Sequence, residues 1–324
     1  MRIGIVVPAY NAARWIGDAI ASVIAQTLAD WRMVVVDDGS TDATCDVVGG
    51  FADARVRLVR QANAGVSAAR NRGMAVLCGE SEDALLFLDA DDWLAPDALP
   101  RLAAALEASP HAVAAAGPFA FAGSAEVRCP PSGDLVDRLL VGNLFANGGH
   151  LLLRHAHVVA AGGFRPGLTY GEDWEFWTRL ALRGAFAAAS GPPVLFVRRH
   201  PESAYRRLAA NPNAFAACTE AIFANPALPA RFGPQRLAAI RRHTEAENQW
   251  IIGRELIRHG RSAEGAAWLR RSVRAHATPR RIALLAAAHA LPLLPATRRG
   301  PFRAYSQSAA WPNDSAGAGR HDDG

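Results

Sequence analysis

The sequence predicts an α/β protein in which helices flank a mostly parallel, Rossmann-like sheet and a helical extension follows. In the N-terminal third, short β-branched runs alternate with segments whose apolar residues recur at helical spacing. A polar loop follows each of the first four predicted strands. After about residue 206 the strand pattern ends, and Ala, Leu and Arg dominate. We therefore expect an α/β domain over 1–205, a helical extension over 206–295 and a disordered tail over 296–324.

The elements of the α/β domain follow in chain order from the apolar spacing. Residues 3–7 form a β-branched run, and the apolar residues between 15 and 24 recur at the spacing of a helix. The pattern then repeats: strands are predicted over 33–36, 56–59 and 84–88, and helices after Ser40-Thr41-Asp42, over 66–77 and from Pro96. Such alternation predicts parallel strands in one sheet. In the extension, residues 250–279 favour an ordinary helix pair over a single tetratricopeptide-like unit.

Charge and residue usage narrow the functional classes. Residues 1–197 hold 15 Arg against 21 Asp and Glu, whereas residues 198–324 hold 20 Arg against 9 acidic residues. All 35 Lys and Arg residues are Arg, so chemistry that needs a catalytic or phosphate-loop lysine is excluded. The Arg-rich part could meet an anionic membrane or a lipid diphosphate, with Arg280-Arg281 and Arg298-Arg299 flanking an apolar stretch. We expect no nucleic-acid partner.

Cysteine spacing and hydropathy indicate the compartment. The four cysteines are scattered, which fits neither a disulfide framework nor a thiolate zinc site, so we expect a reducing cytoplasm. Residues 1–7 indicate a first strand rather than a signal peptide. The longest apolar stretch, 282–295, is shorter than the roughly 20 residues of a membrane-spanning helix, so we expect none.

Polar residues gather at one rim of the predicted sheet. The carboxyl ends of parallel strands lie at the same edge, and ligands of such sheets bind there. Four polar loops on that rim predict a site for a polar, phosphorylated ligand. These loops are Pro8-Ala9-Tyr10-Asn11, Asp37-Asp38-Gly39-Ser40, Asn63-Ala64-Gly65 and Asp89-Ala90-Asp91-Asp92.

The loop after the fourth predicted strand combines three carboxylates that repel one another. Asp89, Asp91 and Asp92 directly follow an apolar run. Mg²⁺ and Mn²⁺ prefer carboxylate oxygens and often keep water and substrate phosphate as further ligands. We therefore expect Mn²⁺ or Mg²⁺ here, which would relieve the repulsion and recruit a diphosphate. The alternative is a solvated turn whose carboxylates cap the next helix.

Six sequence blocks stand in an order that points to a known family. They are VPAYN at 7–11, VDDGSTD at 36–42, NAGVSAARN at 63–71, LDADD at 88–92, GGF at 162–164 with GEDWEFWTRL at 171–180, and VRRHPES at 197–203. Over residues 1–205 the chain closely resembles the family-2 glycosyltransferases of the GT-A fold. The resemblance implies that fold for the α/β domain, and a nucleotide-sugar donor.

The resemblance also implies residues that bind the donor. The main chain at Pro8, Ala9 and Tyr10 would line the nucleoside pocket, although Tyr10 could equally belong to the core. Asp38 would accept a hydrogen bond from the base, a sound role for a carboxylate beside a uracil N–H; alternatively, it caps the next helix. Arg70 would contact the phosphate or the base, with a structural ion pair as the alternative.

The resemblance assigns metal binding and catalysis to residues of the remaining blocks. The resemblance implies that Asp89 reaches the ribose and the metal and that Asp91 is the principal metal ligand, although Asp92 beside it leaves the register open. His200 would close the metal or diphosphate site. Asp173 would be the general base that removes a proton from the acceptor hydroxyl. The preceding residue, Glu172, would take part in catalysis or cap its helix.

Together these observations predict a metal-dependent, inverting glycosyltransferase that moves a sugar from a UDP-linked donor to a hydroxyl of a glycan or lipid-linked acceptor in cell-envelope polysaccharide synthesis. A receiver-type signalling domain is excluded because it needs a lysine. A dinucleotide-dependent dehydrogenase is disfavoured because the first loop has no GxGxxG. The alternative from another class is a catalytically weak scaffold subunit of a polysaccharide-assembly complex.

Overall fold

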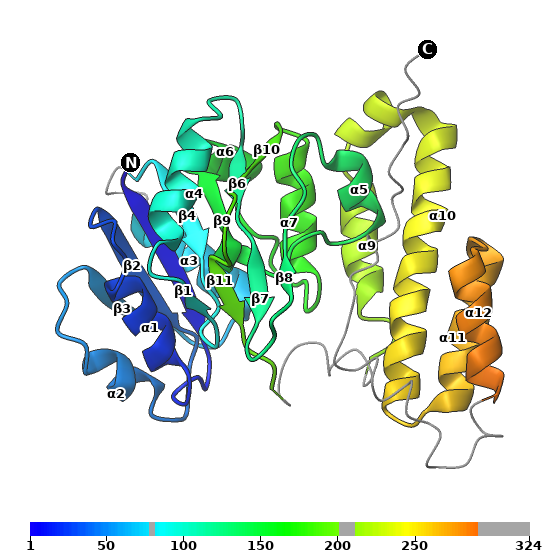
Figure 1. Cartoon of the computed structure of the whole chain (residues 1–324), viewed down its shortest axis with the longest axis horizontal. Helices are drawn as coiled ribbons and strands as arrows, with labels where there is room; N and C mark the ends of the chain where they lie inside the picture. The colour runs from blue at the N-terminus through cyan, green and yellow to red at the C-terminus, as the bar shows by residue number, and fades with distance from the viewer. Residues whose placement is uncertain (78–81, 201–210, 291–324) are drawn as a thin grey trace. The chain divides into compact units, whose positions relative to one another are not determined.

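The computed structural model describes residues 1–77, 82–200 and 211–290 (Figure 1). The chain divides into two compact units. The sheet unit comprises Met1–Leu139, Phe145–Ser203 and Ala216–Asn225, and the helical unit comprises Leu140–Leu144, Ala204–Phe215 and Pro226–Gly324. The boundary expected at 205 and the tail expected over 296–324 lie outside the described residues.

The sheet unit contains the predicted, mostly parallel sheet. Its seven strands stand in the order β10-β6-β9-β4-β1-β2-β3. All pairs are parallel except those of β9, which runs antiparallel to both β4 and β6. The strands are β1 (Ile3–Ala9), β2 (Trp31–Asp37), β3 (Val56–Arg60), β4 (Ala84–Phe87), β6 (Ala114–Ala116), β9 (Leu151–Arg154) and β10 (Phe186–Ala188). The four strands predicted from the sequence therefore correspond to β1 to β4.

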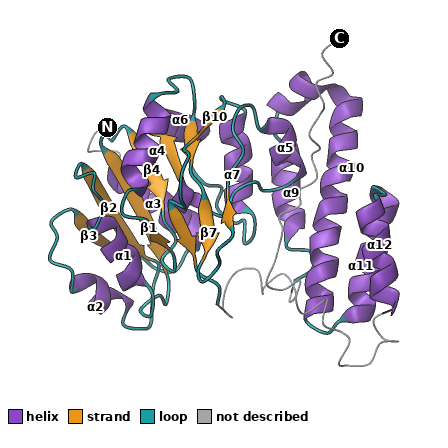
Figure 2. Cartoon of the chain, in the orientation of Figure 1, coloured by secondary structure: helices purple, strands orange, loops and turns teal. Residues whose placement is uncertain are grey.

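Helices cover this sheet, as Figure 2 shows. The helix predicted over 66–77 is confirmed, and the helix expected after Asp42 begins at Thr44, whose backbone N–H donates to Asp42. α3 lies very close to β1, because a Cβ added at Gly73 would lie 2.4 Å from Cγ1 of Val6. The described helices between residues 1 and 225 are α1 (Ile16–Ile24), α2 (Thr44–Gly49), α3 (Val66–Leu77), α4 (Ala98–Glu107), α5 (Val136–Val141), α6 (His155–Ala161), α7 (Glu172–Ala181) and α9 (Phe215–Phe223).

A second, smaller sheet has the order β5-β11-β7-β8. Its strands are β5 (Trp93–Leu94), β7 (Phe119–Phe121), β8 (Val127–Arg128) and β11 (Leu195–Val197). β5 begins directly after the acidic loop and pairs antiparallel with β11. This pairing brings the chain just after β11, residues 198–200, back toward the acidic loop.

The helical unit contains the expected helix pair. α10 (Ala227–Arg258) is broken at Gly233, which precedes Pro234 and has φ 70° and ψ 159°. α11 (Ser262–Ala275) packs on α10 where two glycines meet: a Cβ on Gly253 would lie 2.9 Å from the carbonyl oxygen of Gly265. α12 (Pro279–Ala290) completes a small apolar cluster with them. No helix in the described ranges is both long and apolar enough to cross a membrane.

Candidate active site

The order of the strands brings the predicted polar loops together at one rim. β4, β1, β2 and β3 are neighbours and run parallel, so the loops that follow them share one edge of the sheet. A backbone hydrogen bond of 2.8 Å, from Asp38 N to the carbonyl oxygen of Ala9, joins the first two loops. This is the edge at which we expect a ligand of such a sheet.

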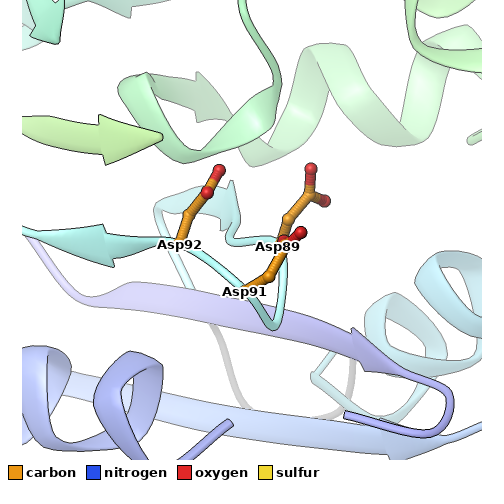
Figure 3. A group of neighbouring side chains, drawn as sticks. All are labelled: Asp89, Asp91 and Asp92. Atoms are coloured by element: carbon orange, nitrogen blue, oxygen red, sulfur yellow. The ribbon is translucent and has the colours of Figure 1, made fainter. Parts of the chain in front are cut away.

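The acidic loop holds three carboxylates in a small volume (Figure 3). One carboxylate oxygen from each of Asp89, Asp91 and Asp92 lies within 4.8 Å of the others. Burial raises the pKa of Asp89, with the charge of Asp91 adding to it and Arg70 opposing it. Burial and the charges of Asp91 and Asp89 raise the pKa of Asp92 well above its ordinary value. Crowded carboxylate oxygens of this kind fit a hard divalent cation, which would relieve the repulsion.

The adjacent carboxylates of Asp91 and Asp92 differ in their exposure and in their hydrogen-bond partners. The side chain of Asp92 is buried, and both its oxygens accept hydrogen bonds: Oδ2 from Nδ2 of Asn147 at 2.5 Å, and Oδ1 from the backbone N of Arg198 at 2.8 Å. The side chain of Asp91 is 31% exposed, and its Oδ2 lies 2.7 Å from Nε2 of His200. Asp91 is therefore the more open of the two adjacent carboxylates, and His200 lies beside it.

The sequence reasoning missed Asn147 and His150, because both lie in a stretch where we found no motif. Asn147 Oδ1 accepts from Gly149 N at 2.8 Å, which fixes the side chain that holds Asp92. His150 is fully buried: Nδ1 lies 2.8 Å from the carbonyl oxygen of Gly117, and Nε2 accepts from Ala146 N at 3.2 Å. Burial lowers the pKa of His150 to about 4, so the ring is neutral at pH 7. The run Asn-Gly-Gly-His was the only sequence signal available.

Arg70 connects the acidic loop to the start of α7. Its Nη2 lies 2.9 Å from Oδ1 of Asp89, and its Nη1 lies 2.9 Å from Oε1 of Glu172. Burial opposes the charged form of Arg70, but the charges of Asp89, Glu172 and Asp173 outweigh it and raise its pKa. The ion pair that the sequence left as the alternative is therefore present, and Glu172 takes part in it.

Asp38 organises the loop that leads into α3. Its Oδ1 accepts from Nε2 of Gln61 at 2.7 Å and from Ala64 N at 2.9 Å, and its Oδ2 accepts from Gly65 N at 2.8 Å. These bonds hold the third polar loop, so the alternative that Asp38 caps α2 is wrong. Gly65 has φ 88°, a value that favours glycine.

The last two residues of β1, Pro8 and Ala9, and the following Tyr10 differ in burial. Ala9 is buried, Pro8 is partly buried, and the side chain of Tyr10 is 54% exposed. The alternative that Tyr10 belongs to the core is therefore wrong. Tyr10 directly follows β1, at the edge of the sheet that carries the polar loops.

Comparison with known proteins identifies the N-terminal segment. The family described as "Glycosyl transferase family 2" matches residues 4–133. An uncharacterized glycosyltransferase, alr2836, of Nostoc is 40% identical over 112 residues, which cover 34% of each chain. The Escherichia coli protein named UDP-Glc:alpha-D-GlcNAc-diphosphoundecaprenol beta-1,3-glucosyltransferase WfgD is 39% identical over 95 residues, covering 29% of this chain and 36% of that protein. The matches thus span about a third of these two relatives.

Solved structures share the fold over nearly the whole chain. The structure of S. aureus TarS 1-349 has a TM-score of 0.56 at 19% identity, with 95% of this chain and 92% of that chain covered. The mannosyltransferase PcManGT from Pyrobaculum calidifontis, in complex with GDP-Man and Mn²⁺, has a TM-score of 0.56 at 21% identity, with 94% and 83% covered. At these identities the likeness shows the fold, which is the GT-A fold expected from the sequence. The family likeness rests on residues 4–133, the segment that matches the description "Glycosyl transferase family 2".

Proposed function

We propose that this protein is a metal-dependent, inverting glycosyltransferase that transfers a sugar from a UDP-linked donor to a hydroxyl of a glycan or lipid-linked acceptor in cell-envelope polysaccharide synthesis. The observation that carries the proposal is the cluster of Asp89, Asp91 and Asp92 at the rim, joined through Arg70 to the helix that begins with Glu172 and Asp173. The names of similar proteins support the donor class: TarS structures contain UDP or UDP-GlcNAc, and WfgD is named for UDP-Glc.

In this proposal, the first three polar loops bind the nucleoside. Pro8 and Ala9 line the pocket with their main chain, and Tyr10 offers an exposed ring beside it. Asp38 holds the loop before α3 through three hydrogen bonds and would accept a further hydrogen bond from the base. We assign these residues to the uridine part of the donor.

The acidic loop would hold the cation and with it the diphosphate. Asp91 is the principal ligand in this proposal because it is the more open carboxylate, and Asp89 and His200 lie beside it. Asp92 accepts hydrogen bonds from Asn147 and Arg198 and thereby fixes the conformation of the loop. When bound, Mn²⁺ or Mg²⁺ would neutralise the charge that develops on the departing diphosphate.

Asp173 acts as the general base in the proposed reaction. The acceptor hydroxyl oxygen attacks the anomeric carbon while the bond from that carbon to the diphosphate oxygen breaks. Asp173 takes the hydroxyl proton, and the diphosphate leaves with the electron pair of the broken bond. A single displacement of this kind inverts the anomeric centre, and a positioned base contributes about 10²–10⁴-fold to the rate.

Two measurements test this function. We expect UDP with Mn²⁺ to raise the melting temperature, and one member of a panel of UDP-sugars to be turned over. Asp173→Asn should lower turnover by at least about 10²-fold while UDP affinity changes little. If no nucleotide or nucleotide sugar shifts the melting temperature, the proposed glycosyltransferase activity is wrong and a scaffold role is favoured. Near-normal turnover by Asp173→Asn would overturn only the assignment of the base.

The helical unit would place the enzyme at the inner face of the membrane, in the cytoplasm. Residues 227–290 hold 12 Arg and 4 Glu. Each Glu forms an ion pair with a neighbour in the unit, so the Arg surplus remains to attract anionic lipid. Arg281, which the sequence placed beside lipid, is instead buried against Glu247; Arg298-Arg299 lie outside the described residues. Failure to bind vesicles of anionic lipid at low salt would contradict this placement.

A further inference from the structure

α3 is fixed to the rest of the sheet unit on both sides of Arg70. On one side, Gly73 lets the helix approach β1 so closely that a Cβ there would lie 2.4 Å from Val6 Cγ1. On the other side, Asn71 forms a reciprocal pair with Phe164: its Nδ2 donates to the carbonyl oxygen at 2.7 Å, and its Oδ1 accepts from the backbone N at 2.8 Å. Arg70 therefore projects from a helix with little freedom to move.

The guanidinium of Arg70 is committed to two carboxylates that are far apart in the sequence. Each of its terminal nitrogens makes one ion pair of 2.9 Å, with Asp89 on the acidic loop and with Glu172 at the first position of α7. The Arg70 side chain is 5% exposed, and its guanidinium carbon lies 5.0 Å from the centre of the Phe164 ring. Nε is buried too, and has no hydrogen-bond partner among the residues that the structure describes.

This geometry argues against direct contact with the donor. A side chain that binds a diphosphate must present N–H groups to the ligand, whereas the Arg70 side chain is 5% exposed and each of its terminal nitrogens already donates to a protein carboxylate. The planar fork suits a bridge between two carboxylates, which the single ammonium of lysine cannot reproduce. Arg70 thus sets where the acidic loop stands relative to the helix that carries Asp173.

We propose that Arg70 is a positioning residue, which locks the cation-binding loop to the start of α7 through Asp89 and Glu172 and so holds the proposed base in register with the donor. The proposal rests on the proposed function for its kinetic consequence only. Displacing a reacting group by about 1 Å can cost about 10²-fold in rate. The bridge should therefore act on turnover and leave donor binding nearly unchanged.

The first test measures the bridge without turnover. Hydrogen exchange at the backbone amides of 172–176 should become faster in Arg70→Met and in Arg70→Lys, because α7 loses its tether. Arg72→Met is the matched control, since Arg72 is an exposed arginine of the same helix. The double variant Arg70→Met with Glu172→Gln should melt higher than Arg70→Met alone, because it no longer leaves the Glu172 carboxylate unpaired. Unchanged exchange at 172–176 in both Arg70 variants would overturn the bridge.

The second test separates positioning from donor contact. Arg70→Lys should lower kcat by about 10²-fold while KM for the UDP-sugar changes less than about 3-fold. A large rise in KM or in the dissociation constant for UDP, with kcat retained, would show that Arg70 contacts the donor and would refute the proposal. Absence of turnover in the wild-type protein would instead refute the proposed function, and hydrogen exchange would still decide whether the bridge exists.

Discussion

Replacing Asp92 by alanine should destabilise the metal-free protein, whereas replacing its neighbour Asp91 should not. Asp92→Ala leaves two donors, the buried Asn147 amide and the partly buried Arg198 backbone N–H, without their acceptor. Each unmade buried hydrogen bond costs about 1–3 kcal/mol. Loss of a buried carboxylate that repels Asp89 and Asp91 offsets part of that cost. We expect a net loss of about 2 kcal/mol, or about 4–8 °C in melting temperature for a unit of this size.

Asp91→Ala should leave the metal-free melting temperature nearly unchanged. The Asp91 side chain is 31% exposed and, within the described part of the chain, forms its ion pair with His200, so its contribution is about 1 kcal/mol or less. Removing its charge also relieves the repulsion in the cluster. Melting curves in excess chelator measure both variants under the same conditions.

Asn147→Ala is the control for this reasoning. It removes one of the two hydrogen-bond donors to Asp92 without changing any residue of the acidic loop. Combined with Asp92→Ala, it should cost less than the sum of the two single changes, since the bond they share is lost only once. If Asp92→Ala melts like the wild type, or if Asp91→Ala is the more destabilised of the two, the assignment of Asp92 as a support of the loop is refuted.

Two further predictions concern pH and metal. Burial lowers the pKa of His150 to about 4 in the folded protein; in the unfolded chain it titrates near 6.5, so between pH 6.5 and 4 only the unfolded chain gains the proton. The contribution of His150 to the free energy of unfolding is thus complete above pH 6.5 and falls by about 3 kcal/mol toward pH 4. Denaturant unfolding of wild type and His150→Gln should show the difference in their free energies of unfolding narrowing by that amount over this range. A difference that stays constant with pH would contradict the prediction. Mn²⁺ at about 100 times its dissociation constant should add about 2.7 kcal/mol of stability, reversed by chelator and absent in Asp91→Ala; an equal gain in that variant would exclude Asp91 as the principal ligand.

Local sequence was sufficient for the first elements of the sheet unit, from β1 to β4. The sequence predicted α3 over 66–77 and placed the ends of the first four strands within two residues, because helical apolar spacing and short apolar runs are visible in the chain itself. It also placed the polar loops at one rim, since parallel strands end at the same edge. The antiparallel β9 was not predicted, because its pairing depends on strands far away in the sequence.

The sequence by itself determined which chemical groups gather at the rim: three carboxylates after β4, Asp38 after β2, and an acidic pair that opens α7. Only the tertiary structure decided what each group does there. Asp92 is held by Asn147, and Arg70 joins Asp89 to Glu172 across 19 and 102 residues of chain. A local pattern records residue type and burial period, whereas the partner of a buried charge is set by chain segments that meet only on folding. That is why two adjacent aspartates, equivalent in the sequence, occupy different environments in the fold.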